Sequence, residues 1–189
     1  MNIQVRQQPQ RITTAEFLAW YEKQPDGQRY ELVSGVVVAM APERISHNET
    51  KMAAWLAFRA AINTAGLPCR AFIDGLGVAV DDEHWRIPDL VVQCIPVIDR
   101  THTKLHAPMI VVEILSPSSV STDTVKKLVE YFSIETVQHY LIIDEDGRTV
   151  VHHKRALAGV LATRIVTSGP IELEPPGFTV AFEDLFAVV

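Results

Sequence analysis

The sequence is poor in cysteine and has no long hydrophobic run. Its two cysteines, Cys69 and Cys94, form no CxxC pair and no framework of close spacings, so neither a zinc knuckle nor a disulfide scaffold is expected. No apolar stretch approaches the roughly 18 residues that a membrane-spanning helix needs. The N-terminal segment is polar and lacks the apolar centre of a signal peptide. We therefore expect a soluble protein in a reducing, cytoplasmic setting, with no membrane partner.

Positive charge is also scarce. The chain has 17 Lys and Arg residues against 23 Asp and Glu residues, a formal net charge of −6. This composition counts against a module that binds nucleic acid through charge alone. It counts less against a nuclease, because bound metal ions offset the charge of an acidic pocket.

Several motifs for cofactors and nucleophiles are missing. The sequence has no GxxxxGK[ST] phosphate loop and no GxGxxG run, so no organic cofactor is expected. The serines at 116, 118 and 119 lack the glycines of a nucleophile elbow, which argues against a serine hydrolase. His102 and His106 lie in a proline-containing loop with no helix to align them, so a zinc pair is not favoured.

The residues that are present favour one folded unit. With 189 residues, 48% of them hydrophobic, the chain is long enough for one buried core and short for two. No internal repeat or low-complexity linker divides it. We expect a single domain over residues 1–189.

Local signals predict the order of helices and strands. Thr13 and Glu16 have capping-box spacing, which predicts a short helix ending at a turn over 25–27, and a hairpin follows over 29–33 and 36–40. Ser46 and Glu49 repeat the capping-box spacing before a long helix that ends at Gly66. Its helical period is carried by Met52, Trp55, Leu56, Phe58, Arg59, Ile62 and Ala65.

The second half of the chain predicts a sheet covered by helices. We expect a meander of strands over 70–74, 76–80 and 87–94, a loop over 95–108, a central strand over 109–112, a helix starting within 118–123, a buried strand over 137–143, and accessory C-terminal strands with a short terminal helix. The buried face of the later helix is predicted to carry Val125, Leu128, Val129 and Phe132. The fold class is therefore α/β (α+β), with a mixed central sheet flanked by helices.

Two carboxylates stand out by their positions. Asp89 precedes the apolar run Leu90-Val91-Val92, and Glu113 ends the apolar run over 109–112. An acid in a buried strand needs a partner, and Mg²⁺ bound by one or two carboxylates is such a partner. Either residue alone is more typical of a structural salt bridge, whereas the pair together favours a metal site.

A set of motifs in fixed order resembles a known family. Pro88-Asp89, Glu113 on a following strand and a helix bearing Lys127 resemble the PD-(D/E)XK nuclease superfamily, and within it the Uma2 family (DUF820) of restriction-endonuclease-like proteins. The matching segments are Tyr30-Glu31-Leu32-Val33-x-Gly35, Pro42, His47, Pro88-Asp89-Leu90-Val91-Val92, Glu113-Ile114-Leu115-Ser116-Pro117-Ser118, Asp123-x3-Lys127-x3-Tyr131 and Tyr140-x3-Asp144.

The resemblance implies a restriction-endonuclease-like fold and a site for hydrolysis of DNA. It implies that Asp89, Glu113 and the backbone carbonyl of Ile114 hold Mg²⁺, with Mn²⁺ as a substitute, and that Glu31 binds a second ion or acts as general base. His47 would contact a phosphate or a water. DNA is the implied partner, and the need to cut two strands favours a homodimer.

The sequence departs from the superfamily pattern at one place. Leu115 stands where the lysine two residues after the acid is expected, and the Uma2-like pattern supplies a lysine from the following helix. That lysine is Lys127, which lies four residues, or one turn, after Asp123, whereas Lys126 points about 100° away. Without the family match, Lys127 would be taken for an ion-pair partner of Asp123, Glu31 for a surface strand residue, and His47 for a helix-start residue.

Three other classes of function remain open from the sequence. The first is a catalytically silent nucleic-acid-binding or assembly protein that keeps the nuclease fold. The second is a metal-dependent phosphodiesterase acting on RNA or nucleotides. The third is a structural subunit of an oligomer.

Overall fold

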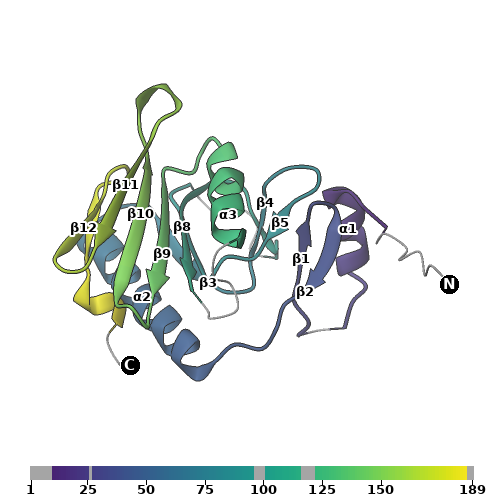
Figure 1. Ribbon diagram of the computed structural model, residues 1–189, viewed down its shortest axis with the longest axis horizontal. Coiled ribbons are helices and arrows are strands. Elements are labelled where there is room, and N and C mark those ends of the chain that lie inside the picture. Colours follow the sequence, from purple (N-terminus) through teal and green to yellow (C-terminus); the bar gives the residue numbers. More distant parts are fainter. Residues whose placement is uncertain (1–9, 26, 96–100, 116–121, 187–189) are drawn as a thin grey trace, which may run out of the picture.

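The structure, a computed structural model, describes residues 10–25, 27–95, 101–115 and 122–186, and only the backbone of residues 122 and 123. Of the range 118–123, within which the sequence predicts a helix start, residues 118–121 lie outside the described part, and the later helix is described from Thr122. Figure 1 shows the arrangement of the elements, with the N-terminal helix and hairpin at one end and the C-terminal strands at the other.

The N-terminal helix and hairpin form as the sequence predicts. Helix α1 (Thr14–Tyr21) begins with a complete capping box, in which the Glu16 carboxylate accepts a hydrogen bond of 2.8 Å from the Thr13 N–H. Strands β1 (Tyr30–Val33) and β2 (Val36–Ala39) pair across a turn at Ser34 and Gly35, which have φ angles of 50° and 74°. Phe17 of α1 packs on the buried Leu32 of β1.

The central sheet is mixed, as predicted. In the described residues it has six strands in the order β11-β10-β9-β8-β6-β3. Within the described strands of this sheet, only β8 and β9 pair in parallel, and helix α3 lies between these two strands in the chain. The strand bounds are β3 Arg70–Ile73, β6 Leu90–Gln93, β8 Pro108–Ile114, β9 His139–Asp144, β10 Thr149–Arg155 and β11 Leu161–Val166.

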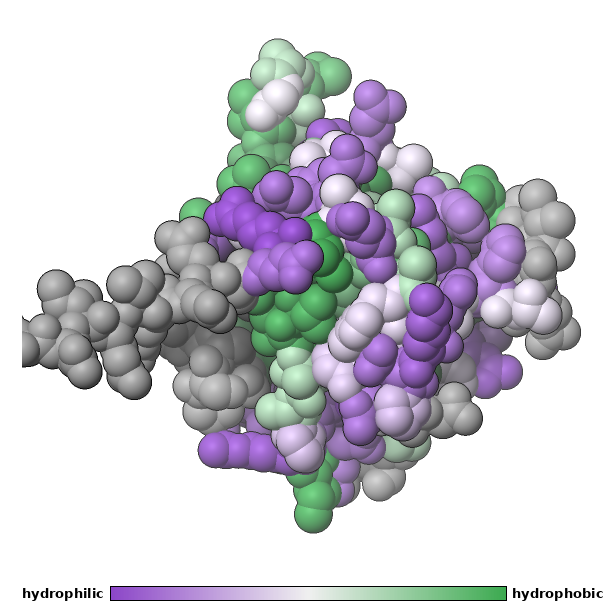
Figure 2. Space-filling view, turned by 90° about the vertical axis from the view of Figure 1, so that its right-hand side faces the viewer, coloured by the Kyte–Doolittle hydropathy of each residue, from purple (hydrophilic) through white to green (hydrophobic). Residues whose placement is uncertain are grey.

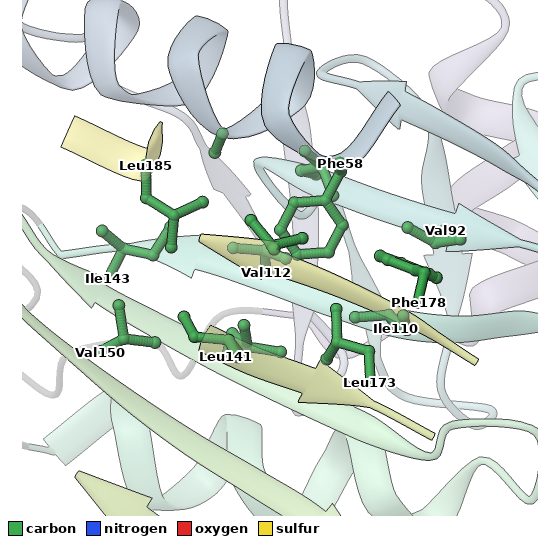
Figure 3. Packing of buried hydrophobic residues seen from close by; sticks show 14 of the residues in the cluster. Phe58, Val92, Ile110, Val112, Leu141, Ile143, Val150, Leu173, Phe178 and Leu185 are labelled. Carbon is green, nitrogen blue, oxygen red and sulfur yellow. The ribbon is translucent and has the colours of Figure 1, made fainter. Parts of the chain in front are cut away.

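Helices α2 (Ile45–Thr64) and α3 (Thr122–Ser133) cover opposite faces of this sheet. Ile110, Val112 and Ile114 of β8 belong to the core under α2, whereas Val111 belongs to the core under α3. This alternation follows from the two-residue period of a strand. Figure 3 shows the first core, where Phe58 of α2 packs over the sheet beside the C-terminal elements.

The start and the buried face of α2 differ from the prediction. Ser46 does not cap the helix: the N-cap residue is Arg44, which makes no side-chain capping bond, and the Ser46 hydroxyl donates to Glu145 instead (2.8 Å). Met52 and Leu56 are each 42% exposed, so the predicted apolar face is wrong at these two positions. Ala54, Phe58 and Ile62 form the buried face, together with the polar side chains of His47, Thr50 and Lys51.

The buried face of α3 also differs from the prediction. Val125 and Val129 are 65% and 68% exposed, whereas Tyr131 is fully buried. The helix turns Lys127 and Tyr131 toward Glu113 of β8, and Glu130 toward the buried Arg86, which lies outside the central sheet. Leu128 and Phe132 pack against the core under α3 as predicted, so the hydrophobic period is wrong only at Val125 and Val129.

The predicted meander over residues 70–94 is wrong. Strand β3 pairs with β6, and β4 (Gly77–Ala79) leaves the central sheet. It pairs with β5 (Trp85–Arg86) and β7 (Lys104–Leu105) in a second sheet of order β2-β1-β5-β4-β7. The loop predicted over residues 95–108 contains β7 and the first residue of β8. Which strands pair depends on contacts distant in the chain, which the local alternation pattern does not encode.

The expectation that the cysteines form no disulfide is also wrong. Arg70 of β3 pairs with Gln93 of β6 in antiparallel register, which places Cys69 and Cys94 opposite each other at the next position. The structure joins their sulfur atoms in a disulfide. Sequence spacing could not reveal this pair, since it arises from the register of two strands.

The C-terminal strands are only partly accessory. β10 and β11 extend the central sheet, and only β12 (Pro170–Leu173) and β13 (Phe178–Ala181) form a separate ribbon, which packs with the 3₁₀ helix η2 (Glu183–Phe186) near α2. The β10–β11 hairpin carries the 3₁₀ turn η1 (Leu157–Gly159) and projects from the molecule, with Leu157 91% exposed. Figure 2 shows the hydrophobic tip of this hairpin above a largely hydrophilic face. In the described part of the chain, no helix has the length and hydrophobicity to cross a membrane.

Candidate metal centre

Asp89 and Glu113 meet at the ends of two paired strands. β6 and β8 are antiparallel with Leu90 opposite Val112, and the same register places Asp89 opposite Glu113. The backbone N–H of Ile114 donates a hydrogen bond of 2.8 Å to Asp89 Oδ2, which fixes this carboxylate against the end of β8. Two acids that lie 24 positions apart in the sequence are therefore neighbours in the fold.

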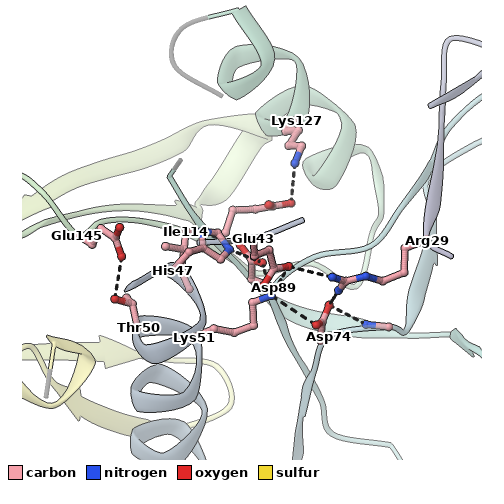
Figure 4. Close-up of polar contacts among 12 residues, drawn as sticks. Arg29, Glu43, His47, Thr50, Lys51, Asp74, Asp89, Ile114, Lys127 and Glu145 are labelled. Carbon is pink, nitrogen blue, oxygen red and sulfur yellow. Dashed lines mark hydrogen bonds and ion pairs between the residues drawn. The ribbon is translucent and has the colours of Figure 1, made fainter. Parts of the chain in front are cut away.

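Asp89 is almost enclosed by polar partners from α2. His47 Nε2 and Lys51 Nζ each lie 3.1 Å from Asp89 Oδ1, and Figure 4 shows both side chains reaching it from the helix. Burial opposes ionisation of Asp89, but the hydrogen bond from His47 and the charge of Lys51 outweigh it, so the pKa of Asp89 lies below its ordinary value. The same hydrogen bond raises the pKa of His47.

Glu113 is held from the opposite face by α3. Its Oε1 atom lies 3.1 Å from Lys127 Nζ and accepts a hydrogen bond of 2.6 Å from the Tyr131 hydroxyl. Burial raises the pKa of Glu113 to about 7; the negative charges of Asp89 and Glu31 act in the same direction, and Lys127 opposes them. The two neighbouring carboxylates thus have pKa values pushed apart, a pattern that is common at functional sites.

Glu31 approaches the same centre from the hairpin, but both of its oxygens already accept hydrogen bonds. Oε1 accepts from the Ile87 N–H and Oε2 from Arg86 Nη1, each at 3.0 Å. Arg86 also donates through Nε and Nη2 to Glu130 of α3, at 2.7 and 2.9 Å. This buried arginine therefore connects the hairpin sheet to the helix that carries Lys127.

A second group of charges adjoins Asp89, and sequence reasoning missed it. Lys51 Nζ lies 2.7 Å from both oxygens of Glu43 and 3.6 Å from Asp74 Oδ2. Arg29 pairs with Asp74 and lies 3.3 Å from Glu43 (Figure 4). Burial opposes ionisation of Lys51, but Asp89 and Glu43 hold the pKa of this amine above its ordinary value. The available sequence signal was a lysine one turn after His47, on the apolar side of α2.

A cavity of about 330 Å³ opens at Asp89 and Glu113. The cavity is bounded by β1, the segment after β2, the start of α2, the ends of β6 and β8, and α3. Its charged and imidazole-bearing lining residues are Glu31, Glu43, Arg44, His47, Asp89, Glu113, Lys127 and Glu145. It is large enough for a phosphate group with its metal ion and water.

The donor set fits a hard divalent cation. Carboxylate oxygens are the ligands that Mg²⁺ and Mn²⁺ prefer. Burial, together with the negative charges of Asp89 and Glu31, raises the pKa of Glu113, and a bound cation would offset those charges. The residues present therefore suit the metal that the resemblance implies.

The structure brings together most of the predicted site residues. Asp89, Glu113, Lys127, Glu31 and His47 all line the cavity. Ile114 lines it too and contributes its N–H to Asp89; metal binding by its carbonyl stays a prediction. The side chain of Asp123, the predicted helix partner of Lys127, lies outside the described residues.

Comparison with solved structures defines the class of fold. A crystal structure described as "a putative nuclease belonging to DUF820", from Anabaena variabilis ATCC 29413, superposes with a TM-score of 0.72. The match covers 93% of this chain and 97% of that one at 19% sequence identity, so it establishes the fold. The fold is thus a mixed α+β, nuclease-like one, as the sequence predicts.

Comparison with protein families gives the family. The model of the Uma2 family, described as "Putative restriction endonuclease", matches residues 14–188. The chain therefore belongs to the Uma2 family, as the ordered motifs predict. It is also 26% identical over 179 residues to a protein of Synechocystis sp. named "Uncharacterized protein slr1290", with 93% of this chain and 92% of that one covered.

Proposed function

We propose that this chain is a metal-dependent endonuclease that hydrolyses DNA phosphodiester bonds. The observation that carries the proposal is the meeting of Asp89 and Glu113 at one strand end, with the Lys127 ammonium 3.1 Å from Glu113. The lysine absent from the position two residues after the acid is thus matched by one from α3. Family membership makes a nuclease the expected class of activity.

Asp89 and Glu113 would hold Mg²⁺, with Mn²⁺ as a substitute and the Ile114 carbonyl as a further ligand. When bound, the ion supplies Lewis-acid polarisation of the phosphate and a lowered pKa for an attacking water. The α3 face contributes the remaining chemistry. Lys127 would orient the water or stabilise the negative charge that develops on phosphorus, since its ammonium lies beside Glu113 in a largely buried site.

Glu31 and His47 flank the pair of carboxylates formed by Asp89 and Glu113, and each would assist the reaction. The resemblance gives Glu31 one of two roles, ligand to a second ion or general base. Either role needs a carboxylate lone pair other than those that accept hydrogen bonds from Ile87 and Arg86. His47 donates to Asp89, and a contact to phosphate or water would use its other ring nitrogen. We further propose a cytoplasmic protein with one domain over residues 1–189, acting as a homodimer on duplex DNA.

The direct test is cleavage of supercoiled plasmid and of circular single-stranded DNA with Mg²⁺ or Mn²⁺. Asp89→Asn and Lys127→Met should each lower the rate by about 100-fold or more, because each removes charge stabilisation at the reacting phosphate. Lys126→Met is the matched control, since Lys126 is exposed on the same helix and should behave as wild type. Cleavage of the circular substrate identifies an endonuclease.

Each other outcome selects a different function. Activity that survives in Asp89→Asn would contradict the proposed metal centre. Activity that survives in Lys127→Met but is lost in Asp89→Asn would contradict the proposed role of Lys127 alone. Cleavage of RNA or nucleotides without cleavage of DNA would favour the phosphodiesterase alternative. DNA binding without cleavage across metals and substrates would favour the silent binding protein.

A further inference from the structure

The feature that the proposed reaction does not use is the buried ammonium of Lys51. Its side chain is 1% exposed, yet it lies on α2 directly behind the candidate metal centre. Its Nζ atom lies 2.7 Å from Glu43, 3.1 Å from Asp89 and 3.6 Å from Asp74. An ammonium group has three N–H donors, and here three carboxylates surround it. Figure 4 shows the side chain extending from α2 into this group.

The same neighbourhood has the composition of a divalent-cation site. Glu43, His47 and Asp89 each offer a ligand atom, and the three atoms lie within 4.8 Å of one another. No other group of this kind occurs among the described residues. Carboxylate oxygens suit Mg²⁺ and Mn²⁺, and Mn²⁺, a first-row transition metal, also accepts an imidazole nitrogen. Lys51 Nζ lies within 3.1 Å of two of the three groups, so the ammonium occupies the space that such an ion would need.

The hydrogen bonds that Asp89 accepts limit the number of metal ions that its carboxylate can bind. Oδ1 is contacted by both His47 and Lys51, and Oδ2 accepts from the Ile114 N–H. A carboxylate has about four lone-pair sites, so these contacts leave one, on Oδ2. One site suffices for a single ion shared with Glu113. It does not suffice for a carboxylate that bridges two ions.

The charge balance points in the same direction. Arg29 and Lys51 face the three carboxylates of Glu43, Asp74 and Asp89. The two cations therefore leave one negative charge among these three carboxylates, next to His47, whose own pKa is raised by Asp89. Without Lys51, Arg29 alone would face three buried or half-buried carboxylates. Their repulsion would then favour uptake of a divalent ion.

We infer that Lys51 is a buried cation that occupies the position of a second metal ion. This centre then works with one divalent ion at Asp89 and Glu113, and of the two roles considered for Glu31 only that of general base remains. The single ion rests on the proposed function, whereas the exclusion of a second one rests on Lys51 itself. Lys51 is a positioning residue: it neutralises Glu43 and fixes Asp89 and does not touch the reacting phosphate.

The test is the number of Mn²⁺ ions bound per chain, measured by calorimetric titration and by the electron paramagnetic resonance signal of free Mn²⁺ near neutral pH. Wild type should bind one ion and Lys51→Met two. The double variant Lys51→Met with Glu43→Gln should return to one, because it removes a ligand of the new site. Lys51→Arg, which keeps the charge, is the matched control and should bind one. Circular dichroism checks that each variant is folded, and Lys51→Gln replaces Lys51→Met if the latter does not fold.

Failure of the inference differs from failure of the proposed function. Equal ion counts in wild type and in folded Lys51→Met or Lys51→Gln would overturn the inference, as would two ions in wild type. A wild type that binds no ion would overturn the proposed metal centre. In that case a gain of one ion in Lys51→Met would still support the role of Lys51, and no gain would overturn it.

Discussion

At the scale of single residues, buried charge is what positions this site. Arg86 is 1% exposed and makes hydrogen bonds to both Glu31 and Glu130, so it holds two carboxylates from separate elements. Burial opposes its charge, but Glu130 and Glu31 hold the pKa of Arg86 above its ordinary value. Breaking such a network by removing one partner leaves uncompensated charge inside the protein.

We therefore predict that Arg86→Met lowers the free energy of unfolding by about 3–5 kcal/mol, as is typical for a buried pair that loses one partner. The reason is that the largely buried carboxylates of Glu31 and Glu130 would lose the cation that neutralises them. Urea unfolding of the apoprotein measures the change. Arg70→Met, at an exposed position, serves as control and should change stability by less than about 0.5 kcal/mol. Equal stability of the two variants would contradict this account.

At the scale of elements, the two long helices divide their faces differently from their hydrophobic patterns. α2 buries small and aromatic residues toward the central sheet and leaves Met52 and Leu56 in solvent. Phe58 is fully buried and meets the ring of Phe178, with centroids 5.8 Å apart. This contact joins α2 to the β12–β13 ribbon, and thereby fixes the helix that carries His47 and Lys51.

Two substitutions on α2 compare the stability contributed by its buried face with that contributed by its exposed face. Phe58→Ala should lower the free energy of unfolding by about 3–5 kcal/mol, because it opens a cavity in the core. Leu56→Ala is the matched control on the same helix and should cost less than about 1 kcal/mol, since its side chain is 42% exposed. Thermal and urea unfolding give both values. A larger loss for Leu56→Ala than for Phe58→Ala would mean that the helix presents its other face to the sheet.

At the scale of the whole molecule, a pair of buried histidines connects the central sheet to the C-terminal ribbon. His139 Nε2 donates to the Pro175 carbonyl at 2.8 Å, so its Nδ1 accepts from His152 Nε2, also at 2.8 Å. Burial lowers the pKa of each histidine to about 4, and for His152 the nearby His139, Arg164 and Lys154 act in the same direction.

This pair of histidines makes the free energy of unfolding depend on pH. The unfolded chain binds more protons than the folded one between the ordinary histidine pKa of 6.5 and the folded value of about 4. The stabilisation is therefore complete above pH 6.5 and is lost as the pH falls toward 4, by up to roughly 3 kcal/mol for each histidine. Urea midpoints of wild type should fall across this range. His152→Gln, which keeps a donor toward His139, should show a shallower fall, and the exposed control His106→Gln should follow wild type. Parallel curves for all three proteins would rule the pair out as the source.

The sequence by itself determined the features that depend on near neighbours in the chain. The capping box at Thr13 and Glu16, the hairpin turn at Ser34-Gly35 and the apolar core of β8 are set by contacts within a few residues or by simple alternation. The ordered motifs also gave the family and fold. They selected Asp89, Glu113 and Lys127, which the fold then places together.

Only the tertiary structure decided which distant residues face one another. His47 and Asp89 lie 42 positions apart, and Arg86 and Glu130 lie 44 apart, so no local pattern encodes either pair. Strand register likewise set the Cys69–Cys94 disulfide and the departure of β4 to the second sheet. No sequence motif selected Lys51, although it lies on the apolar side of α2. Packing of α2 against the ends of the strands buries it among three carboxylates, because a desolvated ammonium is stable only where such partners surround it.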